Sequence, residues 1–186
     1  MPGVVIKFQP NGELAIDGSL RAFGSASNPI IFTSIHDDDC GITGGCGDTD
    51  NASTTPVAGD WLSIWFQPNS GPSSLAYATV RFGGRRVYPE TLGVIHVLPG
   101  ASLEVSHATI EKNYYAGMWI EHASPHLSDS LIQDHVAPSI AQSYGLFLMS
   151  SSTLVVANTH FKHNGAHIST SDPTSMYVDG GGNIME

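Results

Sequence analysis

A right-handed parallel β-helix, an all-β solenoid with about three short strands in each coil, is the fold that the sequence predicts. A short pattern recurs in segments that begin at Leu75, Val105, Leu127 and Val156, at spacings of about 22 to 30 residues. Each segment has a large aliphatic residue, a small residue three places on and a large apolar residue two further. Repeats of this length are typical of solenoids, whose coils stack at a strand spacing of about 4.8 Å.

A second repeated unit has apolar residues two apart, in the stretches 117–120, 145–148 and 165–168. This is the spacing of strands rather than of helices. The composition agrees, because 20 Gly and 11 Pro with only 13% charged residues favour many turns and few helices. We therefore expect residues 1–186 to form a single β-helix module.

In chain order, residues 3–34 supply about the first coil, with alternating strands at 6–8, 14–16 and 20–22. The apolar run 29–34 is a further strand, whose place in the coil the pattern does not fix. Residues 35–59 interrupt the repeat as an inserted Asp/Gly-rich loop, and strands resume at Trp61. Neither end shows a polar cap, and solenoids need caps. We therefore expect a segment of a longer protein, or association of copies end to end or face to face.

Several stretches resemble a known family: Val4–Phe8, Pro29–Ser34, the Asp/Gly-rich loop, Gly59–Trp61 and Val80–Gly84. The resemblance is to the right-handed parallel β-helix repeat modules of large secreted and surface-anchored bacterial and archaeal proteins. It implies an extracellular or cell-surface location and a microbial parent. The chain departs from the family pattern Trp-x-Gly-Ile at Ser63, which stands in the Gly position. Such a resemblance concerns the fold and does not specify a function.

The inserted loop contains a set of oxygen ligands suited to a hard cation. Calcium binds six to eight oxygens, from carboxylates, amides and backbone carbonyls. The spacing does not match an EF-hand, and the alternative is a solvated loop without metal. The predicted calcium ligands are Asp37, Asp38, Asp39, Asp48, Asp50 and Asn51.

The chain has two cysteines, Cys40 and Cys46, both in the inserted loop. Two cysteines that close a short loop in an exported protein predict a disulfide. The alternative is a pair of metal thiolates, for which only His36 is near in sequence.

Strand alternation predicts a row of rings on one outer face, with Lys7 at the same place in the first coil. Such a row is suited to stacking on sugar rings or to contact with a protein partner. The alternative is that a loop such as 35–59 covers it. The predicted ligand-binding residues are Trp65, His96, Trp119, Phe147 and His167.

Two further columns are predicted from the stacking of equivalent residues. One places His107 over Asp129 and Asn158, and the other contains Lys112, Asp134 and His163. His107, Asp129, Asp134 and His163 are thus weak candidates for acid–base catalysis. The structural alternative is ordinary turn residues, with Asn113, His135 and Asn164 forming a hydrogen-bonded ladder from coil to coil.

The charge balance limits the function. The chain has 7 basic and 17 acidic residues, which argues against binding nucleic acid. No run of eighteen apolar residues is present, so no membrane span is expected. The prediction is an extracellular structural and binding module that recognises a glycan or a protein partner. The alternative is a polysaccharide lyase or glycoside hydrolase that acts on an acidic polysaccharide, which requires clustered carboxylates that the row of rings lacks.

Overall fold

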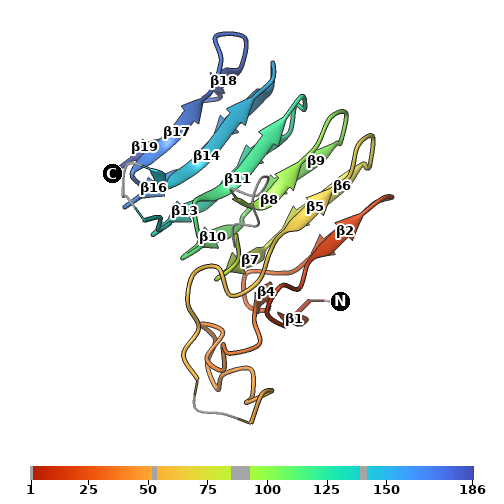
Figure 1. Cartoon of the computed structure of the whole chain (residues 1–186), viewed down its shortest axis with the longest axis vertical. Helices are drawn as coiled ribbons and strands as arrows, with labels where there is room; N and C mark the ends of the chain where they lie inside the picture. Colours follow the sequence, from red (N-terminus) through yellow and green to blue (C-terminus); the bar gives the residue numbers. More distant parts are fainter. Residues whose placement is uncertain (1, 52–53, 85–92, 139–141) are drawn as a thin grey trace.

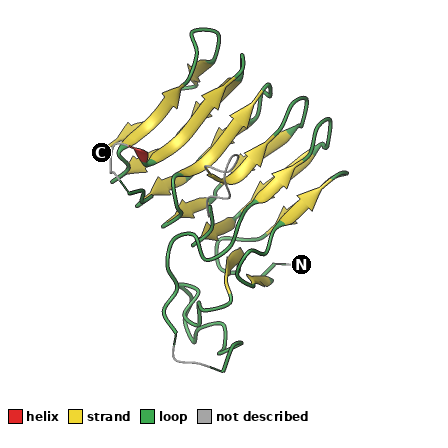
Figure 2. Ribbon diagram, in the orientation of Figure 1, coloured by secondary structure: helices red, strands yellow, loops and turns green. Residues whose placement is uncertain are grey.

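The computed structural model describes residues 2–51, 54–84, 93–138 and 142–186, and it forms a stack of coils (Figure 1). Every third strand along the chain joins the same sheet, so the chain passes through sheets A, B and C in turn. Strands of successive coils pair in parallel within each sheet (Figure 2). The predicted parallel β-helix is confirmed.

Each sheet takes one strand from each coil. Sheet A contains β1 (Val5–Phe8), β4 (Ile30–Ser34), β7 (Ala78–Arg81), β10 (Thr109–Glu111), β13 (Leu131–Gln133), β16 (His160–Lys162) and β19 (Ile184–Met185). Sheet B contains β2 (Leu14–Ile16), β5 (Ile64–Phe66), β8 (Gly93–Val97), β11 (Ala116–Glu121), β14 (Tyr144–Met149) and β17 (Ala166–Thr170). Sheet C contains β3 (Arg21–Phe23), β6 (Ser73–Ala76), β9 (Leu103–Ser106), β12 (His126–Ser128), β15 (Thr153–Ala157) and β18 (Met176–Asp179).

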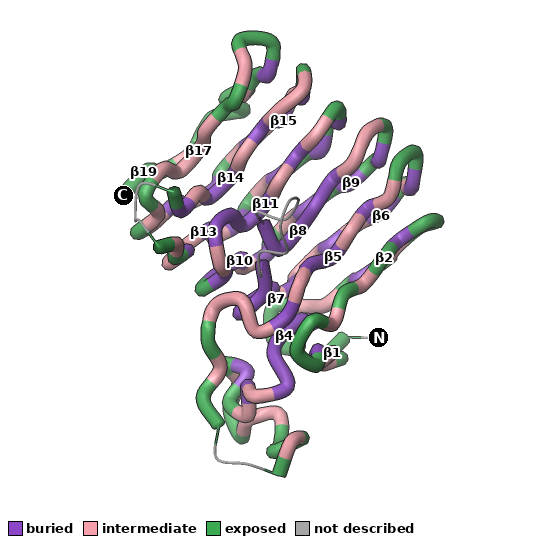
Figure 3. Tube along the Cα trace, in the orientation of Figure 1, coloured by how far each residue is buried: buried purple, intermediate pink, exposed green. Residues whose placement is uncertain are grey.

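The core runs along the inside of the stack, where alternate residues of the three sheets meet (Figure 3). In sheet A, the inward residues Val80, Ile110, Ile132 and Phe161 are in register and fully buried. These are the large apolar residues of the repeated pattern, so the pattern marks the inner wall. Burial of an aliphatic side chain contributes about 1.5 to 3 kcal/mol, which makes this column a main source of stability.

Single residues in the left-handed backbone region turn the chain at both edges of sheet A. The C–A corner column, between sheets C and A, contains Tyr77, His107, Asp129 and Asn158, with φ between 49° and 51°. The A–B corner column, between sheets A and B, contains Phe82, Lys112, Asp134 and His163, with φ between 50° and 63°. Asn, Asp and His adopt this conformation more readily than most residues, so the turn geometry accounts for their recurrence. Both predicted columns are confirmed.

The residues that follow the A–B corner column form the predicted ladder, which we call the corner ladder (Asn113, His135 and Asn164). Asn113 Oδ1 accepts a hydrogen bond from Gly83 N–H at 2.9 Å, and Asn113 Nδ2 donates to Val80 O at 3.1 Å. His135 Nδ1 accepts from Asn113 N–H at 3.3 Å, and Asn164 Oδ1 accepts from His135 N–H at 3.3 Å. Each side chain thus ties its own coil to the one before.

The structure also places the segments that the pattern left open. The run 29–34 becomes β4, between β1 and β7 in sheet A. The inserted loop leaves sheet A at the end of β4, and the chain rejoins sheet B at β5. None of the helices in the described residues is long and apolar enough to cross a membrane.

Candidate functional site

An open groove of about 750 Å³ lies on the outer face of sheet A, beside the C–A corner column. It spans four coils, and the β3–β4 connection closes one end. The sheet A groove is lined by Ser25, Ala26, Pro29, Tyr77, Ala78, Thr79, His107, Ala108, Thr109, Asp129, Ser130, Leu131, Asn158 and His160. Its volume is in the range of ligand-binding clefts.

The groove presents hydrogen-bonding groups at regular intervals. Thr79 and Thr109 are partners in register on neighbouring strands, and both side chains are partly exposed. Tyr77 and His107 stack with ring centroids 4.5 Å apart. Asn158 Nδ2 donates to Asp129 Oδ1 at 3.2 Å, and both residues are exposed. Hydroxyl, imidazole, carboxylate and amide groups therefore follow one another along the stack.

The four catalytic candidates divide between the two corners. His107 and Asp129 line the sheet A groove. Asp134 and His163 lie in the A–B corner column, where His163 Nδ1 is 2.9 Å from Asp134 Oδ1. Among the described lining residues of the groove, Asp129 is the one carboxylate. Glycoside hydrolysis ordinarily needs two carboxyl groups flanking the scissile bond. A second carboxylate, Glu186, stands beside the groove without lining it, with its Oε2 3.0 Å from Nε2 of the lining residue His160.

The row of rings on sheet B has the register predicted for four of its members. Trp65, His96, Trp119 and Phe147 are in register across β5, β8, β11 and β14. The centroid distances are 4.2 Å for Trp65–His96, 6.2 Å for His96–Trp119 and 4.4 Å for Trp119–Phe147. We call these four residues the aromatic column. Because the rings stack on one another, most of their faces are already in contact with a neighbouring ring.

Two expectations about this row are wrong. Ser169, and not His167, is the register partner of Phe147. His167 instead lies beside the core residue Phe161, with centroids 5.9 Å apart. Lys7 belongs to β1 in sheet A, and the sheet B residue of the first coil in this register is Ala15.

The aromatic column is also more buried than an open platform would be. His96 is 2% exposed, and burial lowers the pKa of its imidazole to about 4. Within the described part of the chain, Trp65 Nε1 and His96 Nε2 are buried without a hydrogen-bond partner. The imidazole is therefore neutral at physiological pH and packs as part of the wall.

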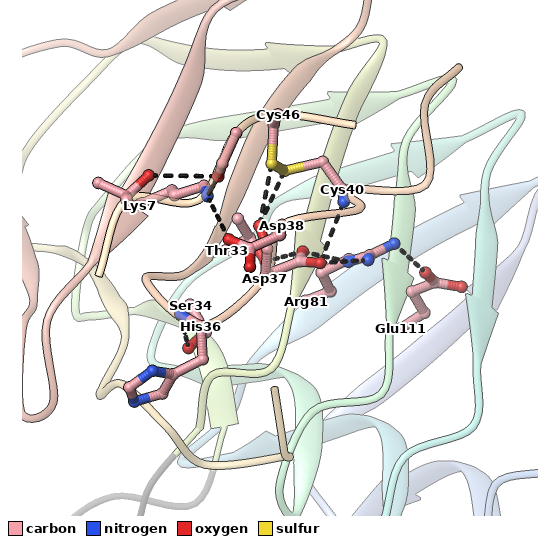
Figure 4. Close-up of a disulfide and its surroundings, with 12 residues drawn as sticks. Lys7, Thr33, Ser34, His36, Asp37, Asp38, Cys40, Cys46, Arg81 and Glu111 are labelled. Carbon is pink, nitrogen blue, oxygen red and sulfur yellow. Dashed lines mark hydrogen bonds and ion pairs between the residues drawn. A yellow bond between two sulfur atoms is a disulfide. The ribbon is translucent and has the colours of Figure 1, made fainter. Parts of the chain in front are cut away.

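The predicted disulfide between Cys40 and Cys46 is present, with Cα atoms 5.7 Å apart (Figure 4). Next to it, Asp37 is buried against the outer face of sheet A and not free to bind a cation. Arg81 Nε and Nη2 each donate to the Asp37 carboxylate at 2.8 Å, and Arg81 Nη1 is 3.4 Å from Glu111 Oε1. This buried ion pair fastens the inserted loop to the coils.

Competing effects set the protonation of Asp37. Burial alone raises the pKa of this carboxyl, but hydrogen bonds from Arg81 and Thr33, with the Arg81 charge, lower it overall. The role of Arg81 as the partner of Asp37 is not predicted from the sequence. Strand register could have indicated it, because one outward column of sheet A contains Thr33, Arg81, Glu111 and Gln133 once β4 is placed.

The structure brings together three of the six predicted calcium ligands. Carboxylate oxygens of Asp38, Asp48 and Asp50 lie within 4.8 Å of one another, which suits a hard cation that binds oxygen. Asp37 is occupied by Arg81, and Asp39 falls outside this group of carboxylates. Two of the three carboxylates already have basic partners: Lys7 Nζ is 3.3 Å from Asp38 Oδ1, and His36 Nδ1 is 2.6 Å from Asp50 Oδ2.

Comparison of the chain with protein-family models, with curated proteins and with solved structures found no match. A fold by itself does not specify an activity, whereas the groove and its side chains limit which ligands can bind.

Proposed function

We propose that this chain is an extracellular binding module that holds a segment of polysaccharide in the sheet A groove. The observation that carries the proposal is the groove itself, about 750 Å³ in volume and lined along four coils by the C–A corner column, with apolar residues such as Leu131 between the polar ones. Its donors and acceptors repeat with the coil rise, which suits a ligand that also repeats along its length.

The chemistry of the lining supports a ligand rich in hydroxyl groups. Threonine hydroxyls, the Asp129 carboxylate and the Asn158 amide offer both donors and acceptors. Tyr77 and His107 add a pair of stacked rings at the corner. Ligand clefts commonly combine a shaped surface with a few polar groups that fix orientation.

The groove is a better sugar site than the aromatic column. Aromatic rings bind sugars through their faces, and those of His96 and Trp119 lie against ring neighbours on both sides in the stack. The edges of such rings offer little area for stacking. The groove, in contrast, is open to solvent along its length.

The extracellular location is part of the proposal. The Cys40–Cys46 disulfide supports it, because disulfides persist mainly in oxidising compartments. The predicted microbial surface parent is compatible with the same setting.

Binding to a panel of soluble polysaccharides tests the proposal. Thr109→Trp places a large ring in the middle of the groove, and we expect it to weaken binding at least tenfold. Thr153→Trp is the matched control, because Thr153 is a partly exposed threonine on the outer face of sheet C. Equal affinities for wild type and Thr109→Trp, with both folded by circular dichroism, would overturn the proposal.

The enzymatic alternative is tested in the same samples. A lyase or hydrolase would shorten the bound polymer, and new reducing ends or unsaturated ends would appear. With a single carboxylate among the described lining residues, we expect binding without turnover.

A further inference from the structure

We infer that the polymer held in the sheet A groove carries amine groups, as amino sugars do, and that the Asp129 carboxylate binds one of them. This inference rests on the proposed function and goes further by giving the ligand a charge. It differs from the acidic polysaccharide of the enzymatic alternative.

The first step is the state of Asp129. It stands at the C–A corner, exposed, with its side chain at the edge of the groove. The amide of Asn158, a neutral group, donates a hydrogen bond from Nδ2 to one carboxylate oxygen of Asp129 at 3.2 Å. Among the described residues, no lysine, arginine or histidine forms an ion pair with Asp129. The carboxylate thus has accepting capacity left for a cationic ligand.

The second step is that the described lining residues of the groove include no arginine and no lysine. Recognition of a uronate carboxylate uses arginine or lysine in the site. The basic groups of the described lining are instead the imidazoles of His107 and His160, and His160 Nε2 is 3.0 Å from Glu186 Oε2. The described lysine and arginine side chains lie elsewhere: Lys7 beside Asp38, Arg81 beside Asp37 and Glu111, Lys162 beside Glu186, Lys112 at the A–B corner and Arg21 on the outer face of sheet C.

The third step is the field of the whole chain. A formal net charge of −10 repels a polyanion and attracts a polycation. The local carboxylate and the overall charge therefore act in the same direction. A neutral polymer would meet neither attraction nor repulsion, so its affinity should be intermediate.

The test uses three hexasaccharides with the same β-linkage, built from glucose, glucosamine or glucuronate, at pH 6 and low salt. We expect the glucosamine hexamer to bind tightest and the glucuronate hexamer weakest. Asp129→Asn should weaken glucosamine binding roughly three- to fivefold, the range of an exposed ion pair, and leave glucose binding unchanged.

Asp134→Asn is the matched control. Asp134 is an aspartate in the same left-handed conformation, but it lies at the A–B corner and pairs with His163. The substitution changes the net charge by the same amount, so it separates the local contact from the overall field. Asn tolerates this backbone conformation, so both variants should fold.

The outcomes separate the two proposals. Tightest binding of glucuronate, or equal loss of glucosamine affinity in the two variants, overturns the amine inference. The proposed function still stands in that case if Thr109→Trp weakens whichever hexamer binds. Failure of all three hexamers to bind overturns both.

Discussion

The two corners that flank sheet A are turned by the same backbone geometry but are used differently. At the A–B corner, the left-handed residue is followed by an inward polar side chain of the corner ladder, which bonds to the preceding coil. At the C–A corner, the residue that follows is small: Ala78, Ala108, Ser130 or Thr159. Ser130 Oγ accepts a hydrogen bond from Ala108 N–H of the preceding coil at 3.0 Å, while the column residues themselves lie outside and line the groove. Side chains therefore join coils at both corners, and the C–A corner column is in addition available to a ligand.

Asn113→Ala should give the largest effect, because it breaks the corner ladder in the middle of the stack. The fully buried Asn113 amide accepts from Gly83 N–H and donates to Val80 O, and both backbone groups would lose this hydrogen bond. We expect the free energy of unfolding to fall by about 3 kcal/mol, measured by urea denaturation.

Asn158→Ala is the comparison at the C–A corner. Its side chain is exposed, so we expect the free energy of unfolding to fall by only about 1 kcal/mol, because alanine is disfavoured in the left-handed conformation of this residue. Equal costs for the two substitutions would contradict the division of roles between the corners.

Trp119→Ala sharpens the contrast between the groove and the aromatic column. The half-buried ring stacks on Phe147 at 4.4 Å and faces His96. We expect a loss of about 2 kcal/mol in stability, roughly half that of a fully buried tryptophan. Polysaccharide affinity, measured by calorimetry below the melting temperature, should stay within twofold of wild type. A loss of binding with unchanged stability would return the ligand to the aromatic column.

His135 makes the corner ladder sensitive to acid. Burial lowers the pKa of its imidazole to about 3, whereas a free imidazole titrates near 6.5. The unfolded chain thus binds the proton more readily, and stability is lost as the pH falls from about 6.5 towards 3. Between pH 6.5 and pH 5 we expect His135 to contribute a loss of about 2 kcal/mol.

His135→Asn provides the control for this slope, since asparagine occupies the neighbouring ladder positions 113 and 164. Thermal melts of both proteins between pH 8 and pH 5 should show a shallower decline for the variant. The remaining slope includes His96, which is also buried with a lowered pKa. Parallel curves would show that His135 is not the group that titrates.

Most of the fold could be predicted from the sequence because stacking repeats the same side chains at the same places. In the sequence, Asn113 and Asn164 indicate the corner ladder, and His107 and Asp129 indicate the C–A corner column. Polar residues recur at both corners. Which corner faces a groove depends on the next residue and on the β3–β4 connection. That information is not contained in the periodicity.

The repeat is a poor guide where it ends or is interrupted. Alignment on the preceding glycine places His167 beside Phe147, but in the structure His167 is in register with Gly145, which lies close to the core residue Phe161. The ion pair between Asp37 and Arg81 joins the inserted loop to a strand 44 residues away. No local pattern specifies such a contact. The sequence therefore shows which loop residues could bind a cation, but not which of them come together.

The inserted loop interrupts the A–B corner between β4 and β5, and we expect calcium binding there to have a small effect on stability. Three carboxylates give fewer ligands than calcium prefers, and Lys7 already lies beside Asp38. With a dissociation constant of about 1 mM, as in weak extracellular sites, 10 mM calcium would add about 1.4 kcal/mol of stability.

Asp48→Asn should remove this gain, and Lys7→Met should increase it by removing a competing charge. Thermal melts with calcium, against magnesium at the same ionic strength, measure both. If calcium leaves all three proteins unchanged, Lys7 and His36 are sufficient partners for the carboxylates, and the loop is fastened by the disulfide and by Arg81.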